Sequence, residues 1–288
     1  MIRKAIKQSI FIFLFFFLTG TAHAFHVSCP DKIPQGGVAL VTVELGEEFI
    51  FCKGIFNGKT VYFNPVDGSQ SFIGLLGVDL NAPVGSKSLS IAAVTADGTQ
   101  EKEDVTIEII PGNFIEQHLT LDEKWVDLDS ETLARIEREN KIITALFRKE
   151  TPKKLWSTAF MVPADGDNTG GFGLKRFING ESKSSHSGID IGVPYGTPVV
   201  ASNDGIVALT IDYFYGGLSV FIDHGQGLYT MYFHLSEILV SEGSSVKKGS
   251  IIGRVGATGR VTGAHLHFAV RLSGNKVNPN ALMNLTLP

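Results

Sequence analysis

Five of the eight histidines in this 288-residue chain lie between positions 186 and 267, a concentration that a metal site would explain. Two of them, His265 and His267, belong to the stretch HLHF. Residues two apart in a strand point to the same face, so we expect these imidazoles to project side by side, with Leu266 and Phe268 on the opposite face. They can share one metal ion, or one can bind metal while the other acts on substrate. An HxH pair alone is weak evidence for either role.

His186 and Asp190 form a second pair, in the stretch SSHSGIDIG. They could be polar residues of a surface loop, but the small residues between them also allow the chain to fold back and bring both side chains together. One carboxylate and two imidazoles suit zinc, and three protein ligands leave the fourth tetrahedral position open to water, as in catalytic sites. Zinc lowers the pKa of bound water to about 7, which provides a nucleophile at neutral pH.

His234 ends the strand-like stretch LYTMYFH. If three of the four groups named above bind the metal, His234 and the remaining one are available for acid–base catalysis. Histidine suits this work because its ordinary pKa of about 6.5 lies near the operating pH. The chain contains no HExxH helix, so a glutamate base of the common metalloprotease kind is not indicated.

Three motifs in order resemble the lysostaphin/LytM-type zinc endopeptidases of peptidase family M23, over most of residues 171–283. The motifs are HSGIDIGVPYGTPVVASNDGIV, LSVFIDHGQGLYTMYFHLS and VKKGSIIGRVGATGRVTGAHLHFAVR. The resemblance implies one Zn²⁺ per chain, and it implies that the metal ligands are His186, Asp190 and His267. It implies that His234 and His265 form the catalytic pair, which orients or deprotonates the water and stabilises the oxyanion. The substrate it implies is a peptide bond in the stems or cross-links of peptidoglycan.

Several positions depart from the pattern of many family members or stand outside its site. Ala269 replaces a glutamate, Asn278 replaces an aspartate, and Lys175 replaces an arginine whose two-pronged hydrogen bonding a lysine cannot reproduce. None of these is a metal ligand. His224, in DHGQG, belongs to the family pattern but not to the ligand or catalytic set, and we predict a structural role for it.

Two other functions compete with an active endopeptidase. Some relatives have lost metal ligands and activate other cell-wall hydrolases, so a catalytically silent scaffold is the alternative, although no ligand is missing here. The stretches TPVVASNDGIV and EGSSVKKGSIIG also resemble hairpins of lipoyl or biotinyl carriers. Lys247 and Lys248 do not stand in the sequence context of a modified lysine, which disfavours a carrier.

The fold that positions these residues is predicted to be mainly β. Residues 157–288 alternate strand-like stretches with glycine-rich turns, which predicts a C-terminal antiparallel β-sheet metallopeptidase domain. Residues 25–112 contain short, evenly spaced strand patterns, which predict an N-terminal immunoglobulin-like β-sandwich.

A linker is expected at 113–156, with a helix at about 130–148. Asp129 or Ser130 can cap this helix, and Glu131 is spaced to pair with Arg135. Its apolar stripe is predicted to comprise Leu133, Ile136, Ile143 and Phe147. The helix is either a simple connection or a regulatory element near the active site.

The N-terminus predicts export. Residues 1–24 combine a basic start, a short apolar run and Ala22-His23-Ala24, which is typical of a cleaved signal peptide. We therefore expect a periplasmic or extracellular protein with no transmembrane segment in the mature chain. In an oxidising compartment, Cys29 and Cys52 are expected to form a disulfide.

Charge is distributed unevenly along the chain. The net charge of −4 becomes −7 once the signal peptide, with its three basic residues, is removed. Residues 25–170 carry −9, whereas residues 171–288 carry +2. The absence of a strongly basic stripe argues against nucleic-acid binding. The acidic half could cover the catalytic groove, so intramolecular inhibition by the N-terminal domain is a further hypothesis.

Overall fold

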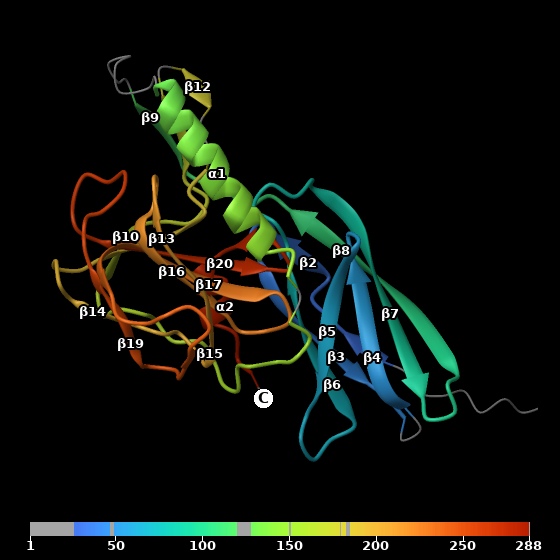
Figure 1. Cartoon of the computed structure of the whole chain (residues 1–288). Helices are drawn as coiled ribbons and strands as arrows, with labels where there is room; N and C mark the ends of the chain where they lie inside the picture. Colours follow the sequence, from blue (N-terminus) through green and yellow to red (C-terminus); the bar gives the residue numbers. More distant parts are fainter. Residues whose placement is uncertain are drawn as a thin grey trace, which may run out of the picture.

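The computed structural model describes residues 26–46, 49–119, 128–149, 151–178, 180–182 and 185–287, and the expected signal peptide at 1–24 lies outside them. The chain is mainly β, as predicted, and its strands form two large sheets that lie side by side (Figure 1). Helix α1 (Ser130–Leu146) rises above the junction of the two sheets (Figure 1). Within the described ranges, no helix is long and apolar enough to cross a membrane.

The N-terminal sheet has the hydrogen-bonded order β1-β3-β6-β5-β4-β7-β8-β2. Its strands are β1 (His26–Ser28), β2 (Lys32–Pro34), β3 (Val38–Glu44), β4 (Phe49–Phe56), β5 (Lys59–Pro65), β6 (Ser71–Gly77), β7 (Gly85–Thr95) and β8 (Gln100–Ile110). Alternate residues of β3 and β7, such as Val41, Val43, Leu89 and Ile91, are fully buried in one apolar cluster. Strands from both ends of the order therefore enclose a common core, which is the arrangement of a sandwich.

The predicted disulfide is not formed, because Cys29 and Cys52 are both free thiols. Cys52 points into the core of the N-terminal sheet and is 1% exposed, whereas the Cys29 thiol donates to the carbonyl of Pro30 at 3.6 Å. Burial raises the pKa of Cys52 to about 12. Burial, with a smaller contribution from the charge of Asp31, raises that of Cys29 to about 11, so both thiols are protonated at neutral pH.

The C-terminal sheet runs in the order β10-β13-β20-β17-β16-β15-β18, with β14 and β19 attached beside β17 and β21 beside β20. Its strands are β10 (Asp167–Gly170), β13 (Gly188–Gly192), β14 (Pro198–Val200), β15 (Gly205–Tyr213), β16 (Gly217–Asp223), β17 (Leu228–Ile238), β18 (Ser245–Val246), β19 (Ile251–Val255), β20 (Leu266–Leu272) and β21 (Asn275–Val277), and helix α2 (Pro279–Met283) follows. The strand pairs are antiparallel, as predicted. One face carries the main core, which includes Tyr232 and Phe268, both fully buried.

Helix α1 occupies nearly the predicted range and is capped by Asp129, whose carboxylate accepts from the Thr132 amide at 2.7 Å. Three residues of the predicted stripe, Ile136, Ile143 and Phe147, are buried or packed against the sheet, and the fourth is not. Leu133 is 53% exposed, while Glu139 is buried with Ile136 and Leu146. Arg135 donates to Glu139 at 2.6 Å rather than pairing with Glu131. The helix packs against polar backbone as well as apolar side chains, which a hydrophobic pattern cannot reveal.

The predicted linker also contributes a strand. Strand β9 (Glu116–Leu119) pairs in parallel with β11 (Lys175–Ile178), which pairs in turn with β12 (Glu181–Ser182). Upstream of β9, the ring of Phe114 packs edge-on against Phe172 with centroids 6.0 Å apart. The segment that leaves the N-terminal sheet is therefore held beside the segment that leads to His186.

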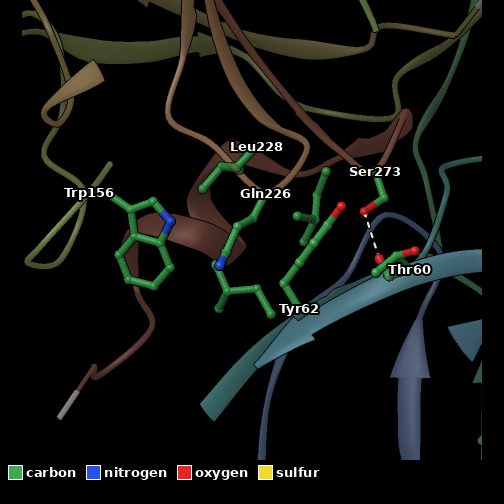
Figure 2. A pocket seen from close by; sticks show the side chains of 8 residues that line it. Thr60, Tyr62, Trp156, Gln226, Leu228 and Ser273 are labelled. Atoms are coloured by element: carbon green, nitrogen blue, oxygen red, sulfur yellow. Dashed lines mark hydrogen bonds between the residues drawn. The ribbon is translucent and has the colours of Figure 1, made fainter. Parts of the chain in front are cut away.

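The two large sheets meet through apolar and polar contacts around a very small pocket (Figure 2). Leu75 of β6 belongs to the main core of the C-terminal sheet. The side-chain amides of Asn64 and Gln226 donate to each other at 2.8 and 2.9 Å, and the Ser273 hydroxyl donates to the Thr60 carbonyl at 3.2 Å. The pocket has a volume of about 10 Å³, which is about the minimum for a single water molecule. It is a packing gap of the interface and not a ligand site.

Candidate metal centre

The register between β13 and β20 builds the centre. Ile189 and Ile191 of β13 are buried in the main core, so strand alternation turns Asp190 to the other face of the sheet. In β20, Leu266 and Phe268 are buried in the same core, so His267 also points to that other face, as predicted from HLHF. Asp190 stands directly opposite His267 in the antiparallel pairing.

Three potential metal-binding atoms converge at this point. His267 Nδ1 lies 2.8 Å from Asp190 Oδ1 and 2.9 Å from His186 Nε2, and His186 Nε2 lies 3.0 Å from Asp190 Oδ1. Zinc bonds of about 2.0–2.1 Å in tetrahedral geometry place ligand atoms about 3.3 Å apart, so this triangle is slightly contracted but of the right size and composition. Among the described residues, these three form the group able to hold a metal ion.

The ring of His186 is oriented by the backbone. Its Nδ1 lies 2.7 Å from the carbonyl of Gly171, and a carbonyl can only accept, so Nδ1 carries the proton and Nε2 presents its lone pair to the centre. Two backbone hydrogen bonds fix the loop: His186 N–H donates to the Leu174 carbonyl at 3.0 Å, and Gly173 N–H donates to the His186 carbonyl at 2.8 Å. This backbone support for a candidate metal ligand could not be read from the sequence.

The electrostatics suit a cation. Burial raises the pKa of Asp190, but hydrogen bonds with His186 and His267 and their charges outweigh this effect and hold its pKa well below the ordinary range. Burial lowers the pKa of His267. The carboxylate is therefore ionised and the His267 imidazole is neutral at neutral pH, which are the forms that bind metals.

His234 is placed by a backbone irregularity within β17. The pairing with β16 shifts register across this position, and His234 adopts φ +62°, which is rare for a residue with a side chain. Its Nδ1 donates to the carbonyl of Thr258 at 2.9 Å, which leaves Nε2 as an acceptor. Burial and the charge of His267 lower the pKa of His234 to about 4, so the ring is neutral at pH 7.

His265 lies next to His234, with ring centroids 4.9 Å apart. It precedes β20 and bridges to Gly256, and its Nδ1 donates to the carbonyl of Gly263 at 3.0 Å. Its Nε2 lies 3.6 Å from Asp190 Oδ1. The structure thus brings together all five residues singled out in the sequence: His186, Asp190, His234, His265 and His267. Two imidazoles with available Nε2 atoms lie beside the three atoms that could bind a metal ion.

His224 lies on the opposite face of the sheet. It is fully buried, its Nδ1 donates to the carbonyl of Asp204 at 2.7 Å, and its Nε2 accepts from the Thr230 hydroxyl at 2.8 Å. The Thr230 hydroxyl also lies 2.9 Å from that of Tyr232, which accepts from the Ser202 amide at 2.9 Å. Both ring nitrogens are used, which accords with the predicted structural role.

The three departures from the family pattern have local explanations. Ala269 is buried in an apolar cluster, and Asn278 caps α2 by accepting from the Asn280 amide at 3.0 Å. Lys175 pairs with Glu116 at 3.5 Å across β9 and β11. Its ammonium group therefore serves the strand pairing that holds β9.

The comparisons with known proteins agree with this geometry. Residues 184–279 match the model of peptidase family M23. The chain is 48% identical over 93 residues to the peptidoglycan DD-endopeptidase ShyA of Vibrio cholerae, and 47% identical over 94 residues to the DD-carboxypeptidase/endopeptidase Mpg of Neisseria meningitidis. These alignments cover 32% and 33% of this chain but only 22% of each relative, so the chain matches about a fifth of their length.

A solved structure extends the likeness to most of the chain. It is a crystal structure from Pseudomonas aeruginosa described as a peptidase M23, with a TM-score of 0.67 and 34% sequence identity. The match covers 86% of this chain and 94% of that one. The similarity therefore includes the N-terminal sheet as well as the part that carries the metal centre.

Proposed function

This chain belongs to peptidase family M23, and we propose that it is a zinc-dependent endopeptidase that hydrolyses peptide bonds in the stems or cross-links of peptidoglycan. The observation that carries the proposal is the convergence of His186 Nε2, Asp190 Oδ1 and His267 Nδ1 within 3.0 Å of one another. Relatives that match the same part of the chain are named as peptidoglycan endopeptidases, which supports the substrate class.

In this proposal His186, Asp190 and His267 hold one zinc ion, which supplies Lewis acidity and makes a water molecule acidic enough to react at neutral pH. His234 is neutral and offers Nε2 as a proton acceptor, because Thr258 fixes its proton on Nδ1. His265 offers Nε2 in the same way. Either ring can accept a proton from the attacking water and then donate it to the developing oxyanion or to the leaving amine.

Digestion of purified sacculi by the full chain tests the proposal. With zinc we expect peptide fragments that mass spectrometry assigns to one type of bond, and with a chelator we expect none. His267→Ala should abolish both zinc binding and digestion, whereas Asp165→Asn, which changes an exposed loop carboxylate, should leave both intact. Full digestion by His267→Ala that is verified to be metal-free would refute a zinc mechanism.

The alternative, a catalytically silent scaffold, makes a different prediction in the same assay. Such a protein would bind zinc and cut no peptide bond, yet would stimulate a cell-wall amidase added to the sacculi. All five side chains that this proposal assigns to hydrolysis are present and lie together, which favours the endopeptidase.

We also propose that the protein is exported. A separate proposal is that the segment containing β9 restrains access of substrate to the candidate metal centre. The restraint is supported by the pairing of β9 with β11, two segments that lead away from the N-terminal sheet and toward His186. A fragment that starts at Asp129 lacks the N-terminal sheet and β9 but keeps α1. If it binds zinc and digests sacculi no faster than the full chain, the restraint is absent.

A further inference from the structure

Helix α1 lies on the face of the C-terminal sheet that carries the metal centre. A second apolar cluster on this face contains Leu146 of α1 together with Met231 and Ala269 of the sheet. The Tyr229 hydroxyl, on the same face, donates to the Leu146 carbonyl at 3.4 Å. Because His267 and Ala269 are two residues apart in β20, the helix covers the sheet right beside the candidate metal ligands.

Glu139 is the buried charged residue of this helix, with 7% of its surface exposed. One carboxylate oxygen, Oε2, accepts from the backbone amide of Phe214 at 2.9 Å. The other, Oε1, accepts from Arg135 Nε at 2.6 Å, and the same guanidinium donates to the Asp212 carbonyl at 3.1 Å. The Arg135–Glu139 pair therefore hydrogen-bonds the backbone at two points, Asp212 near the end of β15 and Phe214 in the turn between β15 and β16.

That turn supports His234 directly. The carbonyl of Gly216, two residues after Phe214, accepts from the His234 amide at 2.7 Å. The backbone of His234, at φ +62°, is strained for a residue with a side chain, and such a conformation persists only when the surrounding structure holds it. The Gly216 carbonyl is one of these supports, and its position depends on the turn that Glu139 holds.

The turn also contacts the loop that orients the His234 ring. The Tyr215 carbonyl accepts from the Arg260 amide at 3.0 Å, and the Leu218 amide donates to the Thr258 hydroxyl at 3.0 Å. Thr258 supplies the carbonyl that accepts from His234 Nδ1. Both the backbone and the imidazole of His234 are therefore linked to the turn.

A groove of about 380 Å³ lies between the helix, the turn and this loop. It is lined by Arg135, Asp212, Tyr213, Phe214, Gly259 and Arg260. Gly259 follows Thr258, whose carbonyl accepts from His234 Nδ1, so the groove borders the loop that orients the His234 ring. A displaced turn would therefore change the shape of the groove as well as the position of His234.

We propose that Glu139 is a positioning residue for hydrolysis, which acts by fixing residues 212–216, the end of β15 and the following turn, which support His234 and form one wall of the groove. The inference rests on the proposed peptidase function for its kinetic consequences, but its structural part stands separately. It makes α1 part of the active-site framework and not a simple connection between the two large sheets.

Kinetics on a soluble cross-linked muropeptide test the proposal with zinc-loaded, full-length variants. Glu139→Ala removes both acceptors, and misplacing a catalytic group by 1 Å can cost about 10²-fold, so we expect kcat to fall by about that factor, with a smaller rise in KM. Glu139→Gln keeps an oxygen acceptor and should recover at least part of kcat. Glu137→Gln is the matched control, because Glu137 is exposed on the same helix and pairs with Lys141 one turn away.

Hydrogen exchange of the same variants is independent of activity. In Glu139→Ala the Phe214 and His234 amides should exchange faster than in wild type, while Glu137→Gln should match wild type. If the wild-type protein cleaves no muropeptide, yet the Phe214 and His234 amides still exchange faster in Glu139→Ala than in wild type, the peptidase function is refuted and the structural role of Glu139 stands. Zinc-loaded Glu139→Ala with unchanged exchange and unchanged kcat would overturn the positioning. If Glu139→Ala fails to fold, Glu139→Gln replaces it in the test. NMR would first show whether the side-chain oxygen of the substituted residue has left the Phe214 amide. If it has, and both exchange and kcat still match wild type, the positioning role is refuted.

Discussion

Asp190 and His267 face each other directly across β13 and β20, with 2.8 Å between Oδ1 and Nδ1. Their proximity is set by strand register, because a slip of one residue would turn Asp190 into the apolar core. The same register places Gly188 opposite Ala269. A Cβ atom at Gly188 would lie 2.8 Å from the His267 ring and 2.4 Å from the Phe268 carbonyl, so glycine is needed there for space.

Gly188→Ala should therefore displace His267 and weaken zinc binding. Overpacking of this kind costs about 1–3 kcal/mol in folding stability, since the backbone carbonyl of Phe268 cannot move aside freely. Zinc stoichiometry by mass spectrometry and thermal unfolding measure the two effects. Gly171→Ala is the control, because a Cβ atom there meets nothing within 4 Å and the carbonyl that orients His186 is retained. Equal zinc occupancy in both variants would contradict the steric argument.

His224 should make the metal-free protein less stable in mild acid. Burial lowers its pKa to about 4, against an opposing hydrogen bond and charge from Asp204. The unfolded chain, with a pKa near 6.5, then binds more protons than the folded one between about pH 6.5 and 4. The contribution of neutral His224 to the free energy of unfolding is fully present above this window and is lost as the pH drops through it. The loss amounts to about 3 kcal/mol in all.

Urea unfolding of wild type and His224→Gln, both with chelator, measures this effect at pH 7.5 and pH 5. Burial also lowers the pKa values of His234 and His267, so the comparison with the variant isolates the part due to His224. The variant should lose less stability between the two pH values than wild type does. Identical pH dependence would show that His224 does not remain neutral in the folded state.

The left-handed backbone at His234 predicts an unusual order of stability. Glycine adopts positive φ freely, whereas an L-residue with a Cβ pays about 1 kcal/mol. Because both substitutions remove the same ring, His234→Gly should be more stable than His234→Ala, with a Tm about 2–4 °C higher. Neither should hydrolyse peptidoglycan, if His234 is catalytic. Calorimetry that finds the alanine variant equal or more stable would show that the bulge relaxes once the ring is gone.

The two cysteines predict a specific thiol count. Burial raises both pKa values, to about 11 and 12, so neither thiol should react readily with Ellman's reagent in the native protein at pH 8. After unfolding in guanidinium, two thiols per chain should react. A Cys52→Ala variant should give one. No reactive thiol in unfolded wild type would mean that Cys29 and Cys52 are joined after all.

Local periodicity was enough to predict much of the architecture. The alternation in HLHF correctly placed Leu266 and Phe268 in the core and turned His267 the other way, and the single helical pattern correctly located α1. These features depend on neighbours along the chain. The convergence of His186 with Asp190 depended on how small residues fold back, and the sequence left that open until the family motifs were considered.

Other features depend on contacts that no local pattern encodes. Glu139 is buried because a backbone amide 75 residues away needs an acceptor, and a charged residue on a helix otherwise predicts exposure. The bulge at His234 needs a register shift between two strands, and the β9–β11 pairing joins segments of the predicted linker and peptidase domain. The disulfide was expected from the compartment alone, which says nothing about where each thiol points.

Strand β20 begins one residue after His265 and ends at Leu272, beside the contact between Ser273 and Thr60. At about 3.3 Å per residue its seven residues span roughly 23 Å, so this contact between the two large sheets lies at the end of the strand farthest from the candidate metal centre. A second contact lies much nearer the centre, because a Cβ atom at Gly36 would meet the ring of Phe172, which follows the Gly171 carbonyl that orients His186. The N-terminal sheet is therefore held both at the far end of β20 and beside the segment that leads to His186.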